Sequence, residues 1–284
     1  MEKPGHFSAA INTYAFPHIG KIKIGDINTS DILRVLTPIW NDKHETARRV
    51  RQRISTVMKW AIGKGWRQDD PAQSITSALP KSNKAPVNRK ALHYRDVSKC
   101  IKAVQSSGAG QTTKLAMEFL ILTATRSGEV RGATWEEFQI PKPDDANRAN
   151  CANPPMWIIP ASRMKAKQEH RIPLSERATE IINEAKLLSD GSKYVFYGTK
   201  HDRPLSDMTL SKLIKELGFD ADVHGFRTSF RTWAQEQTDF AGEIAEAALA
   251  HKVSDKVVAA YARSDYLDKR TQLMKDWAEY LVDS

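Results

Sequence analysis

A stretch without hydrophobic periodicity divides this sequence and limits what it can fold into. Residues 77–92, SALPKSNKAPVNRKAL, are rich in Pro, Ser, Asn and Lys, which is the composition of a solvated linker. At 284 residues, the chain is long enough for two packed units. We therefore predict a boundary near Ala85, with one domain over residues 1–84 and a second over residues 85–284.

Both halves carry amphipathic helical patterns. Before the boundary we predict a helix over residues 29–40, capped by Thr29 or Ser30, and a helix from residue 45 that ends at Gly63 or Gly65. After the boundary, helical patterns occupy residues 94–105, 114–138, 175–188, 206–218, 223–235, 241–252, 254–264 and 266–282.

One segment of the second half has a different pattern. MWIIPASRMKAKQEHRIPL, residues 156–174, has apolar runs on both sides of a polar, turn-like KAKQE, which is typical of a β-hairpin. The predicted fold is therefore mainly α-helical with one small antiparallel β-sheet.

The charge balance favours a polyanionic partner. With 43 Lys and Arg against 34 Asp and Glu, the formal net charge is +9, which suits nucleic acid or a membrane surface. No apolar run is long enough to span a bilayer, and the N-terminus lacks a secretory signal. The two isolated cysteines, Cys100 and Cys151, indicate neither a disulfide framework nor a thiolate metal site. We therefore expect a cytoplasmic protein without a membrane partner.

Two helical segments concentrate basic side chains. In VHGFRTSFRTWAQ, residues 223–235, His224, Arg227 and Arg231 share one helix face with no acid close in sequence, so that face presents hydrogen-bond donors to an anion. The helix from residue 45 carries a second set that could contact phosphates: Arg48, Arg49, Arg51 and Arg53. An ordinary solvated face is the alternative for this second set, and a charge run alone favours that alternative.

Four further residues have an ordinary structural explanation when each is considered alone. Arg126 follows the apolar run MEFLILTAT, where RSGEV permits a turn and a new helix capped by Ser127; a guanidinium beside a helix N-terminus can bind an anion. Lys165 lies at the hairpin tip, where it is either solvated or able to reach a groove and act as an acid. His251 follows a helix of small residues, and Tyr261 would ordinarily be half-buried.

The order of these residues changes that interpretation. TATRSGEVRGATWEEF, HGFRTSFRTWA, LAHK and AYARSDYLDKR resemble, in this order, the active-site motifs of the tyrosine recombinases, the phage integrase family. FPHIGKIKIGDINTSDILRVL and KWAIGKGWRQDDPA resemble the core-binding domain of prophage and genomic-island integrases. The resemblance covers nearly the whole chain. It implies a helical, SAM-like core-binding domain followed by a tyrosine-recombinase catalytic domain.

The resemblance also implies a chemical role for each motif residue. Arg126 and Arg227 would bind the scissile phosphate, and Tyr261 would attack it to form a 3′-phosphotyrosyl bond and release a 5′-hydroxyl. The remaining roles are proton transfer by His224, protonation of the departing oxygen by Lys165, a hydrogen bond to the phosphate from His251, and orientation of the site by Glu129. Neither a cofactor nor a metal is expected.

Several alternatives stay open. Tyr266 is a rival nucleophile and Lys167 a rival acid, while Arg231 lies outside the family pattern and is assigned to a phosphate flank or the surface. The last helix either packs on its own domain or docks on a neighbouring subunit. Its apolar face does not choose between them, and the resemblance favours docking in a synaptic tetramer. We also expect the family's N-terminal arm-binding domain to be missing from this chain.

The expected partners are double-stranded DNA attachment sites, three further copies of the chain in a synaptic tetramer, and an accessory DNA-bending protein. A catalytically inactive DNA-binding relic and a topoisomerase that only nicks and reseals are the competing functions.

Overall fold

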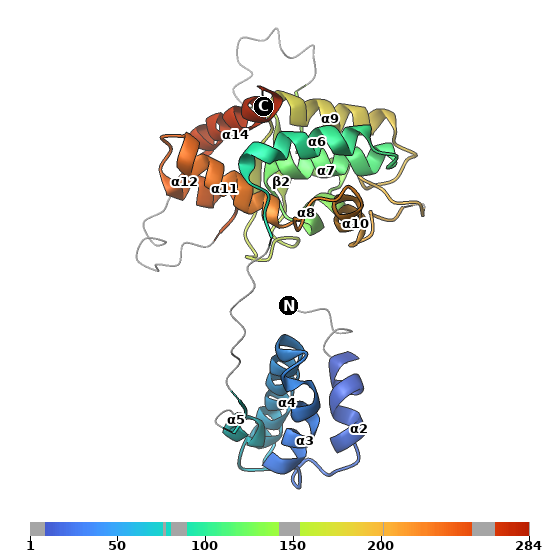
Figure 1. The fold of residues 1–284 in the computed structure, drawn as a ribbon, viewed down its shortest axis with the longest axis vertical. Helices are drawn as coiled ribbons and strands as arrows, with labels where there is room; N and C mark the ends of the chain where they lie inside the picture. Colours follow the sequence, from blue (N-terminus) through green and yellow to red (C-terminus); the bar gives the residue numbers. More distant parts are fainter. Residues whose placement is uncertain are drawn as a thin grey trace. The chain divides into compact units, whose positions relative to one another are not determined.

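A computed structural model describes residues 9–75, 78–80, 90–141, 154–200, 202–251 and 265–283. The chain divides into two compact units, Met1–Val87 and Asn88–Ser284, each with its own hydrophobic core (Figure 1). The boundary predicted near Ala85 falls in segment 81–89, outside the described residues. None of the helices within the described ranges is long and apolar enough to cross a membrane.

The N-terminal unit is helical. Its elements are η1 (Ile11–Ala15), α2 (Phe16–Ile19), α3 (Thr29–Trp40), α4 (His44–Gly63) and α5 (Pro71–Ser74). Helices α3 and α4 were predicted, whereas the helical turns of η1 and α2 were not. The apolar faces of α3 and α4 meet in a core that includes Ile32, Leu36 and Ile54.

The start of α3 differs from the prediction by one residue. Asn28 is the cap, because its side-chain oxygen accepts hydrogen bonds from the backbone nitrogens of Ser30 and Asp31, at 2.9 and 3.2 Å. The Asp31 carboxylate in turn accepts from the Asn28 backbone nitrogen at 3.1 Å, which completes a capping box. Thr29 and Ser30 are therefore the first helical residues rather than the cap.

The C-terminal unit is mainly helical, as predicted. Its helices are η3 (Tyr94–Asp96), α6 (Val97–Ser106), α7 (Gln111–Thr123), α8 (Ser127–Arg131), η4 (Trp135–Glu137), α9 (Glu176–Leu187), α10 (Thr209–Glu216), α11 (Gly225–Gln237), α12 (Gly242–Ala248) and α14 (Leu267–Asp283). The helix predicted over residues 254–264 lies outside the described residues.

A three-stranded antiparallel sheet accompanies these helices in the order β1 (Phe138–Gln139), β2 (Met156–Ile159), β3 (His170–Pro173). The predicted hairpin is confirmed as β2 and β3, with Ile159 opposite His170. Strand β1 was wrongly predicted as the end of a helix. It pairs with β2, where Phe138 lies opposite Trp157 and stacks on it, with ring centroids 5.6 Å apart and an interplanar angle of 6°.

Helix α7 is the central element of the C-terminal core, and α14 packs against it. Every residue of α7 from Leu115 to Thr123 is buried, as expected for a helix covered on all sides. Trp277 of α14 is fully buried and donates a 3.0 Å hydrogen bond from Nε1 to the Ile121 carbonyl oxygen. Within this chain the last helix therefore packs on its own domain, whereas the resemblance favoured docking on a neighbouring subunit.

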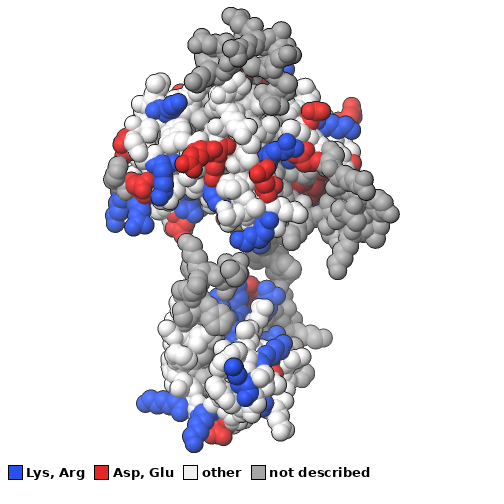
Figure 2. Space-filling view, turned by 180° about the vertical axis from the view of Figure 1, so that it is seen from behind, with Lys and Arg blue, Asp and Glu red and all other residues white. Residues whose placement is uncertain are grey.

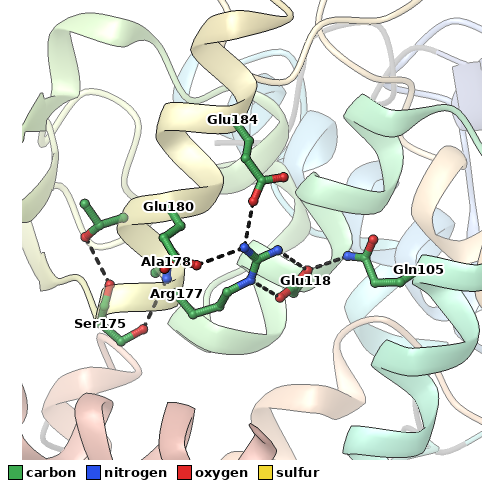
Figure 3. Close-up of polar contacts among 8 residues, drawn as sticks. Gln105, Glu118, Ser175, Arg177, Ala178, Glu180 and Glu184 are labelled. Atoms are coloured by element: carbon green, nitrogen blue, oxygen red, sulfur yellow. Dashed lines mark hydrogen bonds and ion pairs between the residues drawn. The ribbon is translucent and has the colours of Figure 1, made fainter.

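An ion-pair network fixes α9 against α7 (Figure 3). Arg177 donates from Nε and Nη2 to the two carboxylate oxygens of buried Glu118, at 2.7 and 3.1 Å, and from Nη1 to Glu184 at 2.7 Å. Gln105 of α6 donates to the same Glu118. The hydrogen bonds that Arg177 donates to Glu118 raise the pKa of Arg177 above its ordinary value.

Candidate active site

Arg126 stands at the junction between α7 and α8. Ala124 ends α7 in the left-handed conformation, with φ 48°, and Arg126 takes the N-cap position of α8 that was predicted for Ser127. Glu129 accepts from both the backbone nitrogen of Arg126, at 2.9 Å, and its Nη1, at 2.8 Å. The carboxylate of Glu129 therefore fixes the Arg126 guanidinium.

Arg227 is buried on α11, with only 3% of its surface exposed. Its Nη1 donates to the Ala124 carbonyl oxygen at 2.6 Å and its Nη2 to the Leu249 carbonyl oxygen at 2.5 Å. These two carbonyls lie at the C-terminal ends of α7 and α12. Within the described part of the chain, Nε of Arg227 has no hydrogen-bond partner. An unpaired buried donor costs about 1–3 kcal/mol, so the fold holds this guanidinium in place at a cost in stability.

The two guanidiniums are close enough to influence each other. Burial, and after it the positive charge of Arg126, lowers the pKa of Arg227 to about 10. Glu129 and Glu246 act in the opposite direction without cancelling this effect. Arg227 stays protonated at neutral pH, so the site concentrates positive charge where little water can screen it. Such a site favours an anion.

His251 contacts Arg227 directly. It follows Ala250, which has φ 48°, and its Nε2 lies 3.1 Å from Nη2 of Arg227 while its Nδ1 lies 2.7 Å from Oε2 of Glu246. A guanidinium can only donate hydrogen bonds. Nε2 of His251 is therefore the acceptor in this contact, and Nδ1 carries the proton that Glu246 accepts.

His224 and Arg231 flank Arg227 on α11. His224 is exposed at the N-cap of that helix. Arg231 pairs through Nε with Oε1 of Glu246 on α12. The expectation from the sequence that this face lacks a nearby acid is therefore wrong for Arg231, because the fold brings in Glu246 from 15 residues further along the chain.

Gly225 is needed for the chain to reach this arrangement. A Cβ atom at this position would lie 2.1 Å from the Lys90 carbonyl oxygen and 2.8 Å from Cα of Ala91. Both contacts are with backbone, which cannot rotate away. The glycine after His224 thus allows the start of α11 to pack on the segment that enters the C-terminal unit.

The lysine and the tyrosines differ in what the structure describes. Lys165 is exposed on the connection between β2 and β3, beside buried Met164, and no hydrogen bond within the described residues joins it to the arginines. Tyr261, the predicted nucleophile, lies in segment 252–264, outside the described residues. Tyr266 precedes α14, and the negative charge of Glu243 is the main cause that raises its pKa. A raised pKa makes the phenol of Tyr266 harder to ionise.

Arg163, which was not singled out from the sequence, connects the hairpin to α8. Its Nη2 donates to the Glu129 carbonyl oxygen at 2.5 Å, and its Nη1 donates to Oε1 of buried Glu137 at 2.5 Å. Glu137 also accepts from Nε1 of Trp157 at 2.9 Å. One arginine therefore links the lysine-bearing connection to the residue that holds Arg126. Since Glu137 is 26 positions away, sequence spacing carried no signal for it.

His170 is a second buried group that the sequence did not indicate. This residue of β3 is 7% exposed, and its Nε2 lies 3.2 Å from the Ala248 carbonyl oxygen, to which it can only donate. Burial first, and then the positive charge of Arg270, lowers the pKa of His170 to about 4. The imidazole is therefore neutral at pH 7 and ties the end of α12 to the sheet.

The arginines of α4 do not share one exposed face. Arg48 and Arg49 are exposed and both donate to Glu45, at 3.0 and 2.9 Å. Arg51 donates to the Ala72 carbonyl oxygen at 3.1 Å, and Arg53 is 8% exposed. Arg53 lies three residues from buried Val50, so it turns toward the core. Figure 2 shows Lys and Arg prevailing over Asp and Glu on the displayed face of the N-terminal unit, with both signs interspersed on the C-terminal unit.

Two family models match this chain. The model of the phage integrase central domain matches residues 5–78, and that of the phage integrase family matches residues 90–267. The chain therefore belongs to the phage integrase family.

Named relatives and solved structures agree with that assignment. Prophage integrase IntA of Escherichia coli (strain K12) is 31% identical over 268 residues, covering 93% of this chain and 61% of that protein. The integrase of Enterobacteria phage P4 is 29% identical, covering 95% of this chain and 63% of that protein. The chain thus spans about three-fifths of the length of these relatives.

The fold is shared with crystal structures of lambda integrase. A lambda integrase(75–356) dimer bound to a COC′ core site superposes with a TM-score of 0.63 and 20% identity, covering 92% of this chain and 88% of that chain. The Tn1549 transposon integrase, in complex with circular intermediate DNA, has a TM-score of 0.61 and 14% identity, covering 94% and 91%.

Proposed function

We propose that this protein is a site-specific DNA recombinase that cleaves and rejoins strands for the integration or excision of a mobile element. The observation that carries the proposal is the pairing of Arg126, fixed by Glu129, with buried Arg227, whose Nε lacks an acceptor among the described residues. A scissile phosphate bound beside the two guanidiniums neutralises their positive charge. Relatives named integrases and a fold shared with DNA-bound lambda integrase support this function.

The proposed reaction conserves the energy of the broken bond. The Tyr261 oxygen attacks phosphorus, its proton passes to His224, and the bond from phosphorus to the 5′-oxygen breaks. Lys165 protonates that oxygen, which leaves a 3′-phosphotyrosyl enzyme and a free 5′-hydroxyl. Attack by the 5′-hydroxyl of a partner strand then reverses each proton transfer. Arg126 and Arg227 stabilise the extra negative charge of the pentavalent transition state.

The proposed partners are duplex DNA attachment sites and three further copies of the chain. Lambda integrase has been solved as a tetramer bound to a Holliday junction, with a TM-score of 0.64 and 20% identity to this chain. Exposed Arg48 and Arg49 are the α4 residues proposed to contact DNA phosphates. Arg231, which pairs with Glu246, is proposed as a flanking charge of the active site. Phosphate contacts make the affinity fall steeply with salt.

Trapping of the covalent intermediate tests this function. A pool of nicked duplexes with randomised core sequences is incubated with the protein in a metal chelator, and DNA that remains attached after denaturation is sequenced. We expect an adduct with the wild type and with Tyr266→Phe, but none with Tyr261→Phe.

The other outcomes are equally informative. An adduct that survives Tyr261→Phe and disappears with Tyr266→Phe transfers the nucleophile to Tyr266. Salt-sensitive binding without any adduct contradicts the proposal and favours the inactive relic. Recombinant products from two labelled duplexes separate strand exchange from simple nicking and resealing.

A further inference from the structure

We propose that Glu246 is a positioning residue for His251, with its carboxylate holding the imidazole in the Nδ1–H tautomer so that Nε2 faces Arg227. This inference rests on the proposed recombinase function, since it assigns His251 its orientation in that active site. The sequence motifs did not include Glu246, which lies on α12 five residues before His251.

A continuous chain of contacts carries the proposal. Oε2 of Glu246 lies 2.7 Å from Nδ1 of His251, and Nε2 of the same ring lies 3.1 Å from Nη2 of Arg227. The backbone supports the geometry, because the amide nitrogen of His251 donates to the Glu246 carbonyl oxygen at 3.0 Å. Glu246 thus holds His251 through both its side chain and its main chain.

The hydrogen-bond directions leave only one compatible neutral tautomer. A carboxylate accepts and a guanidinium donates, so the imidazole must present N–H to Glu246 and a lone pair to Arg227. In the opposite tautomer, the bare Nδ1 would face the Glu246 carboxylate, which is acceptor against acceptor. Its Nε2–H would face the Arg227 guanidinium, which is donor against donor. A histidine tautomer is set by the partner of its other nitrogen, and here Glu246 is that partner.

Arg231 gives Glu246 its second contact. Its Nε pairs with Oε1 of Glu246, so the carboxylate lies between an arginine and a histidine. The Glu246 side chain is 33% exposed, compared with 39% for His251 and 59% for Arg231. Among the described residues, the charged groups in contact with His251 are therefore Glu246 from α12 and Arg227 from α11, and Arg231 reaches His251 only through Glu246.

This arrangement explains how His251 can serve a phosphate bound at Arg227. When the phosphate binds, Nε2 takes up a proton from solvent and donates it to a phosphate oxygen in place of accepting from Arg227, while Glu246 accepts the hydrogen bond from Nδ1. A carboxylate that orients a catalytic histidine acts in the same way in serine proteases. Without Glu246, the ring can rotate or change tautomer, and the donor to the phosphate is lost.

The tautomer itself provides a test that does not depend on activity. Full-length protein labelled with ¹⁵N at histidine is studied by two-bond ¹H–¹⁵N correlation, with His251→Asn assigning the signal. We expect the Nδ1–H form of His251 in the wild type and in the control Glu236→Gln. We also expect it in Glu246→Gln, because the amide oxygen of the glutamine can still accept the hydrogen bond from Nδ1. The control removes the same charge from an exposed position of α11. We expect Glu246→Ala to lose the Nδ1–H form, and its retention overturns the proposal.

Covalent adduct formation provides the second readout. We expect Glu246→Ala to slow the reaction about tenfold to a hundredfold, within what a positioned proton donor contributes, with substantial recovery in Glu246→Gln and no change in Glu236→Gln. A wild-type rate in Glu246→Ala overturns the positioning role. Failure of the wild type to form any adduct would instead reject the recombinase function, and the tautomer measurement would still decide the structural part of the proposal.

Discussion

Nη1 of Arg227 donates a 2.6 Å hydrogen bond to the carbonyl oxygen of Ala124, although the two residues are 103 positions apart in sequence. Ala124 lies two residues before Arg126. This contact joins the first and second arginine motifs through the backbone turn that ends α7. The left-handed conformation of Ala124 directs its carbonyl toward α11 and lets the chain present Arg126 at the start of α8. The two cations are therefore placed by a single turn.

Replacement of Arg227 by lysine tests whether the site needs a guanidinium, which donates through two nitrogens, or only a positive charge. A lysine keeps the charge but cannot bridge the Ala124 and Leu249 carbonyls while also facing His251. We expect Arg227→Lys to slow formation of the covalent adduct by at least about 10²-fold, the usual effect of losing one fixed donor to a transition-state oxyanion. Arg203→Lys, at an exposed position, is the control and should react like the wild type. Equal rates for both variants would show that charge alone suffices.

Arg163 supports the site through two acceptors at once. In Arg163→Lys, one ammonium replaces the guanidinium that reaches both Glu137 and the Glu129 carbonyl, so the Lys165 connection and α8 lose their link. Because small misplacements of reacting groups are costly, we expect adduct formation to fall about tenfold to a hundredfold. Far-UV circular dichroism should remain that of the wild type. A wild-type cleavage rate would show that Arg163 has only a structural role.

The sequence predicted the elements that depend on residues close together in the chain. The period of apolar residues located α3, α4, α9 and the β2–β3 hairpin, and the motif order located Arg126, Arg227 and His251 in one family pattern. The structure brings these three residues together through contacts of Arg227 with Ala124, Leu249 and His251.

Contacts made across long sequence separations could not be predicted in the same way. Strand β1 is only two residues long and depends on stacking against Trp157. The burial of Arg53 depends on how α4 is rotated against its neighbours, which the charge run does not reveal. Glu246 and Glu137 acquire their roles only when the fold places them beside Arg231 and Arg163.

Close backbone packing at Gly225 predicts a loss of stability on addition of a methyl group. In Gly225→Ala, the Cβ atom would lie 2.1 Å from the Lys90 carbonyl oxygen, so either the backbone at Lys90 and Ala91 or the start of α11 must move. We expect the free energy of unfolding to decrease by about 1–3 kcal/mol, as for other overpacked sites, measured by urea denaturation. Gly242→Ala is the matched control, because nothing lies within 4 Å of its Cβ. A similar change in both variants would contradict this account.

Protonation of His170 predicts a loss of stability in mild acid. The folded-state pKa of about 4 lies below the ordinary value of 6.5, so the unfolded chain binds a proton between these values and the folded chain does not. This contribution is complete above pH 6.5 and is lost as the pH falls toward 4. At pH 5 the loss amounts to about 2 kcal/mol of unfolding free energy. Urea denaturation at pH 7 and pH 5 measures the loss, which should be smaller in His170→Gln. An unchanged pH dependence in that variant would assign the effect to other groups.

The network around Arg177 predicts a large and repairable loss of stability far from the arginine site. Arg177→Ala leaves the carboxylate of Glu118, which is 6% exposed, without its main counter-charge. Removing one partner of a buried pair typically costs about 3–5 kcal/mol. We expect the double variant Arg177→Met/Glu118→Leu to recover most of that loss in urea denaturation, because it removes both charges and fills the space. Lys212→Ala, which breaks an exposed pair with Glu216, should cost less than about 1 kcal/mol. A double variant no more stable than Arg177→Ala would show that the network contributes packing rather than charge compensation.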